Sequence, residues 1–139
     1  MATPLRVPYL SIVPAMGDAG IMPYLPVALE YQGKSMVASA LVDTGATLNV
    51  VPYSLGLSLG AVWREEAAVL SLAGNLAPYP ACPLFLSVTI GTFAPVRLAF
   101  AWTQTENVPL LFGQTNFFTE FDVCFFRARK IFEVQPKQL

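Results

Sequence analysis

Hydrophobic and polar residues alternate over short stretches of this chain, and glycines and prolines separate these stretches. Residues 24–31 alternate well enough to predict a strand with its apolar side chains on one face. Gln32-Gly33 supplies a tight turn, and residues 34–42 make the returning strand. This second strand is apolar on both faces, so we expect it to lie in the middle of the packed structure, with Asp43 at its carboxyl end.

The rest of the chain repeats this strand-rich pattern. Further strands are expected at residues 5–13, 48–51, 83–90, 94–102, 122–126 and 131–134, and within 63–72. Phenylalanines at helical spacing predict one short amphipathic helix within residues 114–121. No stretch longer than about ten residues favours a helix, so the predicted fold class is mainly β. We interpret residues 1–139 as one domain, in which the loosely organised residues 1–20 are a flexible arm or a pro-segment.

Composition raises the question of a membrane segment, because 55% of the residues are apolar and only 12% are charged. The longest uncharged stretch, residues 67–96, carries four prolines and two glycines, so no continuous apolar helix fits there. We therefore predict no membrane contact, and the absence of a secretory signal pattern favours a cytoplasmic protein. The low charge leaves two explanations open: a partner subunit covers much of the surface, or a large β core has a sticky exterior.

The chain contains no histidine, which excludes Ser-His-Asp and Cys-His hydrolases and almost all catalytic zinc sites. Phosphate-binding glycine loops are absent too, so we predict no cofactor. Cys82 and Cys124 lack neighbouring ligands, and we expect two buried thiols and no metal. Arg127, Arg129 and Lys130 cluster between apolar runs, which is typical of a solvated hairpin turn and not of a nucleic-acid-binding surface. Hydrolytic chemistry would have to use carboxylates or a lysine.

Asp43 is the acid with the most unusual surroundings. It is one of three aspartates, and it lies in an Asp-Thr-Gly turn between two apolar runs. Burying an isolated carboxylate is costly, so such a residue needs a partner or a chemical task. The alternative is a structural Asx turn, in which the carboxylate accepts hydrogen bonds from its own turn. Asp18 and Asp122 lack this context, and we interpret both as structural or surface groups.

The Asp-Thr-Gly-Ala sequence at residues 43–46 resembles the motif of the retropepsin-like, single-domain aspartic proteases. In that family apolar strands flank the motif, a β-hairpin flap follows, and an apolar-apolar-glycine segment leads into a single helix. Residues 70–83 match the flap, and residues 110–113 followed by 114–121 match the later segment. The resemblance covers about residues 24–134. It implies a small, closed, barrel-like β fold with a flap hairpin and one short C-terminal helix.

The resemblance also implies a homodimeric aspartic endopeptidase that acts on polypeptides. Because each chain carries one Asp-Thr-Gly, the two catalytic carboxylates would be Asp43 of each subunit, meeting on a twofold axis. In the family the threonine hydroxyl, here that of Thr44, hydrogen-bonds across the dimer beneath the carboxylates. The glycine, here Gly45, lets the substrate backbone approach. The residues expected to contact substrate are Gly45, Ala46, Thr47, Leu72, Ala73, Gly74 and Asn75.

The chain departs from the retroviral pattern at two positions. Retroviral relatives carry an ion-paired aspartate and arginine where this chain has Thr47 and Gln114. Loss of one partner would strand a charge, whereas loss of both leaves two neutral groups that can still meet. Two other functions stay open on the sequence: a non-catalytic dimeric module that binds peptides or a partner protein, and an interaction subunit of a larger complex.

Overall fold

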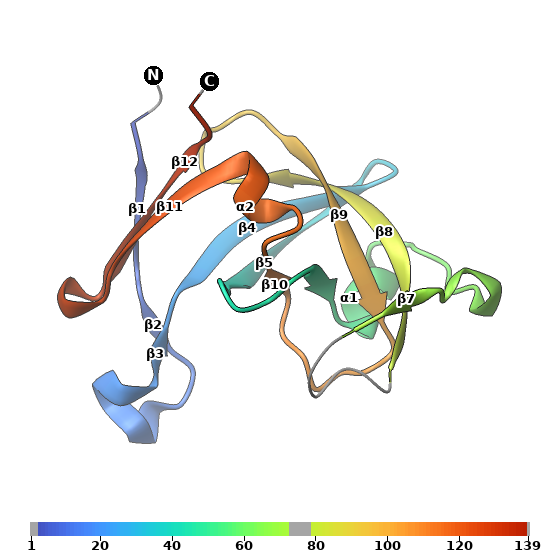
Figure 1. Ribbon diagram of the computed structural model, residues 1–139, viewed down its shortest axis with the longest axis horizontal. Helices are drawn as coiled ribbons and strands as arrows, with labels where there is room; N and C mark the ends of the chain where they lie inside the picture. Colours follow the sequence, from blue (N-terminus) through green and yellow to red (C-terminus); the bar gives the residue numbers. More distant parts are fainter. Residues whose placement is uncertain (1–2, 73–78, 139) are drawn as a thin grey trace.

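The computed structural model describes residues 3–72 and 79–138, which form a mainly β protein built on a closed barrel of six strands (Figure 1). In barrel order the strands are β4 (Tyr24–Tyr31), β5 (Lys34–Val42), β10 (Leu111–Phe112), β6 (Asn49–Val51), β9 (Val96–Thr103) and β8 (Pro80–Thr89). The barrel closes because β4 also pairs with β8. The predicted mainly β class is confirmed.

The β4–β5 hairpin has the boundaries that the sequence predicts. Gln32 and Gly33 take φ values of 48° and 84°, the left-handed conformations that suit a two-residue hairpin turn. The inward-facing side chains of β4 are buried, as expected: Leu25, Val27 and Leu29. The first half of β5 differs from the prediction, because Val37 on its outer face is 78% exposed. Burial of this strand increases toward its carboxyl end, where β10 pairs with it.

A second sheet of three antiparallel strands lies beside the barrel (Figure 1). Its order is β1 (Leu5–Pro8), β12 (Ile131–Pro136) and β11 (Phe121–Phe126). The edge position of β1 agrees with the proline that the strand contains. All four residues of β1 pair with β12, so the expectation of loose organisation at the N-terminus is wrong for this strand. Phe121, Phe132 and Val134 join the face of this sheet to the main hydrophobic core.

Residues 10–22 form a ribbon that we call the arm. It consists of β2 (Leu10–Ser11), the 3-10 helix η1 (Pro14–Gly20) and β3 (Ile21–Met22), and β2 pairs with β3 in antiparallel orientation. In Figure 1 the arm projects below the three-stranded sheet. Pro23 joins the arm directly to β4, so the arm ends where the barrel begins.

The helices of the described residues are short. α1 (Tyr53–Ser58) follows β6, η2 (Glu65–Ala67) precedes the two-residue strand β7 (Leu70–Ser71), and η4 (Arg127–Arg129) turns the chain between β11 and β12. The strand expected within 63–72 is thus reduced to β7. The basic residues of the last turn are exposed, as predicted. In the part of the chain that the structure describes, no helix combines the length and the apolar character needed to cross a membrane.

The helix expected within residues 114–121 is shorter than predicted. α2 spans Phe117–Glu120 alone. The backbone N–H groups of Gln114 and Thr115 donate instead to the carbonyl oxygens of residues 46 and 47, at 2.9 Å and 2.7 Å. Pairing with the Asp-Thr-Gly loop therefore keeps this segment extended until the helix begins. α1 is a further short helix, which lies outside this C-terminal segment.

The two cysteines are both free and differ in exposure. Cys82 in β8 is buried, and burial raises the pKa of its thiol. Cys124 in β11 is exposed, which corrects the expectation of two buried thiols. Side chains alternate across a strand, so Cys124 faces solvent while its neighbour Val123 packs against the core.

Candidate functional site

Asp43 lies on the loop that joins β5 to β6. β10 pairs in parallel with β5 and in antiparallel orientation with β6, so it lies between the two strands that flank the loop. The Asp43 backbone N–H donates to the Phe112 carbonyl oxygen at 3.0 Å, and the Ala46 N–H donates to the Asp43 carbonyl oxygen at 3.1 Å. The backbone of this acid is therefore fixed by β10 and by its own turn, and its side chain is half-buried.

The Asp43 carboxylate takes part in a short Asx turn. The Gly45 N–H donates to Asp43 Oδ1 at 2.9 Å. A Cβ at position 45 would lie 3.3 Å from the same oxygen, so glycine allows the turn to close this tightly. Among the hydrogen bonds of the described residues, no other donor reaches the carboxylate, which leaves Oδ2 open to further contacts.

Asn49 is a completely buried polar residue that holds the loop to the barrel. Its Oδ1 accepts a hydrogen bond from the Gly113 N–H at 2.8 Å. Its Nδ2 donates to the Ala99 carbonyl oxygen at 3.0 Å and to Asn116 Oδ1 at 3.1 Å. Sequence reasoning missed this residue, although a polar side chain inside the apolar run at residues 48–51 was a visible signal.

Gly113 allows the two segments of the site to touch. A Cβ at this position would lie 2.6 Å from the Leu48 carbonyl oxygen and 2.7 Å from that of Ala46. Such distances are far inside van der Waals contact, so any larger residue would push the Asp-Thr-Gly loop away from β10. Position 113 therefore requires glycine, because the backbone of residues 46–48 packs directly against it.

Gln114 contacts the Asp-Thr-Gly motif at Thr44, whereas the sequence suggested a contact with Thr47. Its Nε2 donates to the Thr44 carbonyl oxygen at 2.8 Å. Thr47 meets this segment through its backbone, because its carbonyl oxygen accepts from the Thr115 N–H. The expected meeting of the Thr47 and Gln114 side chains is therefore replaced by a bond from Gln114 to Thr44.

An apolar hollow of about 270 Å³ opens beside Asp43. Its lining residues are Met22, Pro23, Leu41, Val42, Asp43, Thr44 and Phe125. The hollow thus brings together the end of the arm, the end of β5 and one side chain of β11. Sequence reasoning did not find Met22 or Phe125, because neither is near Asp43 along the chain.

The residues predicted to contact substrate differ from one another in exposure and location. Gly45 and Thr47 are exposed and Ala46 is half-buried, and none of the three is among the residues that line the Asp43 hollow. Leu72 is buried in a small apolar cluster with Val50, Ala81, Ala101, Val108 and Leu111. Ala73, Gly74 and Asn75 lie outside the described residues. β7 pairs with the start of β8, near the two ends of the segment 70–83 that the resemblance matches to a flap.

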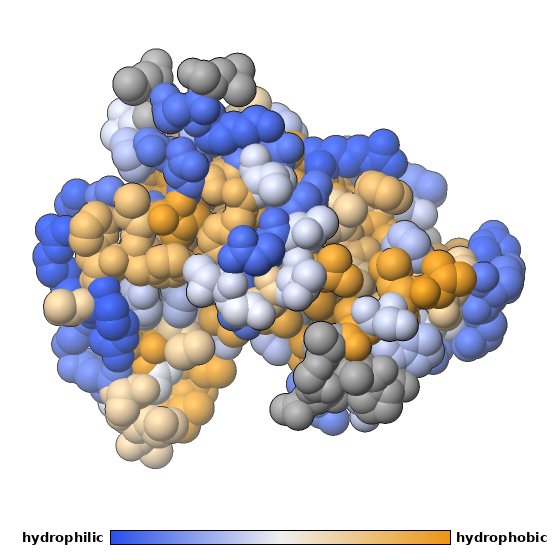
Figure 2. All heavy atoms as spheres, in the orientation of Figure 1, coloured by the Kyte–Doolittle hydropathy of each residue, from blue (hydrophilic) through white to orange (hydrophobic). Residues whose placement is uncertain are grey.

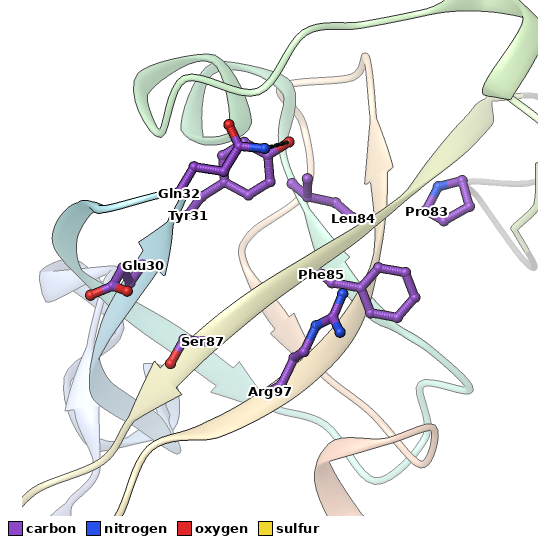
Figure 3. A pocket seen from close by; sticks show the side chains of 8 residues that line it. All are labelled: Glu30, Tyr31, Gln32, Pro83, Leu84, Phe85, Ser87 and Arg97. Carbon is purple, nitrogen blue, oxygen red and sulfur yellow. Dashed lines mark hydrogen bonds between the residues drawn. The ribbon is translucent and has the colours of Figure 1, made fainter.

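A larger hollow, of about 450 Å³, lies where the β4–β8 ladder ends (Figure 3). It is lined by Glu30, Tyr31, Gln32, Pro83, Leu84, Phe85, Ser87 and Arg97. The Arg97 guanidinium lies 4.6 Å from the Phe85 ring centroid, and Glu30 points away from both in Figure 3. Its ionisable groups do not converge, so the Asp43 hollow is the better candidate site.

The described residues contain no candidate metal centre, and the comparisons with known proteins found no match. Within residues 3–72 and 79–138, no group of three or more His, Cys, Asp or Glu side chains is arranged to hold a metal ion. No family model matches the chain, and neither a curated protein nor a solved structure matches it. The functional conclusion therefore depends on the chemistry of the site itself.

Proposed function

We propose that this protein is a homodimeric aspartic endopeptidase with a retropepsin-like fold. The observation that carries the proposal is a half-buried carboxylate, Asp43, at the edge of an apolar hollow and on a backbone loop that is fixed from both sides. Preorganisation of this kind is what catalysis by a carboxylate requires, because a misplaced acid cannot align a water with a peptide bond.

The order of elements also supports the proposal. The Asp-Thr-Gly loop follows a buried strand end, β7 and β8 form the stem of a hairpin, and a short helix follows Gly113. The closed six-stranded barrel is compatible with the small barrel that the resemblance implies. The cytoplasmic location and the polypeptide substrate remain parts of this proposal.

In the proposed dimer, the Asp43 carboxylates of the two subunits share one proton, because two carboxylates about 3 Å apart cannot both be charged. The ionised carboxylate takes a proton from a water held between the pair, and the water oxygen bonds to the scissile carbonyl carbon. The protonated carboxylate gives its proton to the carbonyl oxygen. The carboxylate that took the proton of the water then gives it to the amide nitrogen, and the C–N bond breaks. The other carboxylate takes a proton from a hydroxyl group on the former carbonyl carbon, so the pair again holds one proton.

The neighbours of Asp43 have distinct roles in this scheme. The Thr44 hydroxyl would bond across the twofold axis and fix the separation of the carboxylates. Gly45 N–H holds one carboxylate oxygen within the turn, which orients the other toward the water. The apolar walls of the hollow lower the local dielectric, so hydrogen bonds and charges in the site act more strongly than in bulk water.

A non-catalytic peptide-binding module is the second candidate. The bond from Gly45 N–H to Asp43 Oδ1 favours it, because that bond alone gives Asp43 a structural reason to be present. Such a module would use the same fold and the same dimer, but it would hold extended peptides without cleaving them.

Cleavage by single-residue variants separates the two candidates. Asp43→Asn keeps an oxygen that can accept the Gly45 hydrogen bond, so the turn survives while the ionisable group is lost. We expect Asp43→Asn to lower cleavage of a peptide library at pH 3–7 by at least about a thousandfold. Asp122→Asn, at an exposed acid of β11, is the matched control and should behave like the wild type. An active Asp43→Asn protein, or a wild type that cleaves nothing, contradicts the protease.

A further inference from the structure

The arm carries an unusual density of exposed apolar side chains. Among the described residues, five of the twelve exposed large apolar side chains fall within residues 10–22: Leu10, Ile12, Val13, Met16 and Met22. Ile12 is 62% exposed and Met16 is 54% exposed. Figure 2 shows apolar colours over the arm, at the lower left of the view. Clustered apolar surface of this kind marks an interaction site, whereas scattered residues do not.

The apolar face of the arm is continuous with the Asp43 hollow. Leu10 and Met22 lie opposite each other on β2 and β3, so their side chains share one face of the ribbon. Met22 lines the same hollow as Asp43 and Thr44. Phe125, which is 39% exposed, continues the apolar surface on the far wall of that hollow.

Polar contacts keep the arm in its extended position. Lys130 forms an ion pair with the Asp18 carboxylate, and Arg127 Nη2 donates to the Asp18 carbonyl oxygen at 2.9 Å. The hydrogen bond from Lys130 holds the pKa of Asp18 below its usual value. The turn between β11 and β12 thus anchors the tip of the arm, and the apolar side chains stay exposed instead of folding back onto the barrel.

The terminal strands are already paired within the chain. β1 runs beside β12 from the pair Leu5–Val134 to the pair Pro8–Ile131, and β12 is covered on its other side by β11. β12 therefore has no free edge, and in this sheet only the outer edges of β1 and β11 are open to another strand. Among the described residues, the exposed large apolar side chains that line the Asp43 hollow are Met22 of the arm and Phe125.

We propose that the arm and Phe125 form the face on which a second copy of this chain docks, with the twofold axis passing beside Thr44. This inference rests on the proposed function, because one Asp-Thr-Gly per chain leaves an acid pair incomplete without a second subunit. Each arm then covers the rim of the Asp43 hollow of the other subunit, so docking brings the two acids together and shields the rim of the hollow from bulk solvent.

The test is the dimer dissociation constant of the full-length chain, measured by sedimentation equilibrium. The double variant Ile12→Glu/Met16→Glu puts charges into the proposed interface at two highly exposed positions that do not line the Asp43 hollow. Burying those charges is costly, so the dissociation constant should rise by at least about a hundredfold. Val37→Glu is the matched control, because Val37 is 78% exposed on the outer face of β5. It should dimerise like the wild type, and all three proteins should share one denaturation midpoint at a protein concentration where each is a monomer.

The outcomes separate the interface from the chemistry. A double variant that dimerises as tightly as the wild type overturns the proposed interface, as does a wild type that stays monomeric at high concentration. The first result leaves the Asp43→Asn cleavage assay free to support the protease, whereas a monomeric wild type contradicts the homodimeric protease as well. A dimer that depends on the arm but cleaves nothing supports the interface and contradicts the protease.

Discussion

Two regions border the Asp43 hollow, and they are held in place by different means. The loop at residues 43–48 is held by backbone hydrogen bonds to β10 and the residues after it, and by the buried side chain of Asn49. The arm is held at its tip by exposed charged groups, and its apolar side chains face solvent. The loop makes all of its stabilising contacts within the single chain. The arm exposes apolar side chains, which a second copy could cover in the proposed dimer.

The energetic difference between the two regions follows from burial. A buried donor or acceptor that loses its partner costs about 1–3 kcal/mol, because nothing replaces the lost bond. An exposed ion pair contributes little to stability, since water solvates both charges when it breaks. We therefore expect the loop to control the stability of the fold and the arm to control assembly.

The largest expected effect comes from Asn49→Leu. The substitution leaves the Gly113 N–H, the Ala99 carbonyl and Asn116 without their buried partner, so the free energy of unfolding should fall by about 3 kcal/mol. Urea denaturation followed by circular dichroism measures it. Asn107→Leu, at an exposed asparagine, is the control and should change stability by less than about 0.5 kcal/mol. Equal effects of the two substitutions would show that the loop does not depend on its buried network.

A smaller effect is expected when the anchor of the arm is removed. The pKa of Asp18 is lowered in the folded protein, so its contribution is present above the unfolded pKa and is lost as the pH falls through the folded value. Asp18→Asn at neutral pH should reproduce the acid effect, with faster hydrogen exchange at the amides of β2 and β3. Exchange in β4 and β5 should not change. Uniform acceleration in all four strands would mean that the arm and the barrel are one cooperative unit.

The sequence predicts the parts of the fold that depend on local patterns. The β4–β5 hairpin is predicted with its boundaries, because strict alternation and the Gln32-Gly33 turn are properties of neighbouring residues. The helix within 114–121 is predicted too long, because its first residues pair with the loop at 46–47, far away along the chain. The exposure of Cys124 and Val37 likewise depends on which strands become neighbours.

The candidate site divides in the same way. Asp43 is identifiable because its motif and its flanking apolar runs are contiguous. Met22 and Phe125 are not, because their places beside Asp43 depend on contacts that only the folded chain creates. Asn49 is visible as a polar residue in an apolar run, but its hydrogen-bond partners are not. Gln114 shows the limit of aligning single positions, since its side chain bonds to Thr44 and not to the residue that the retroviral pattern suggests.

Subunit mixing tests most directly whether two Asp43 residues act as one site. Wild-type protein is mixed with an equal amount of Asp43→Asn protein, equilibrated until subunits exchange, and assayed for peptide cleavage. If each active site needs one Asp43 from each subunit, half of the wild-type chains enter inactive mixed dimers, and cleavage per wild-type chain falls to about half. A ninefold excess of the variant should lower it to about a tenth. Cleavage per wild-type chain that stays constant at every ratio would contradict the shared acid pair.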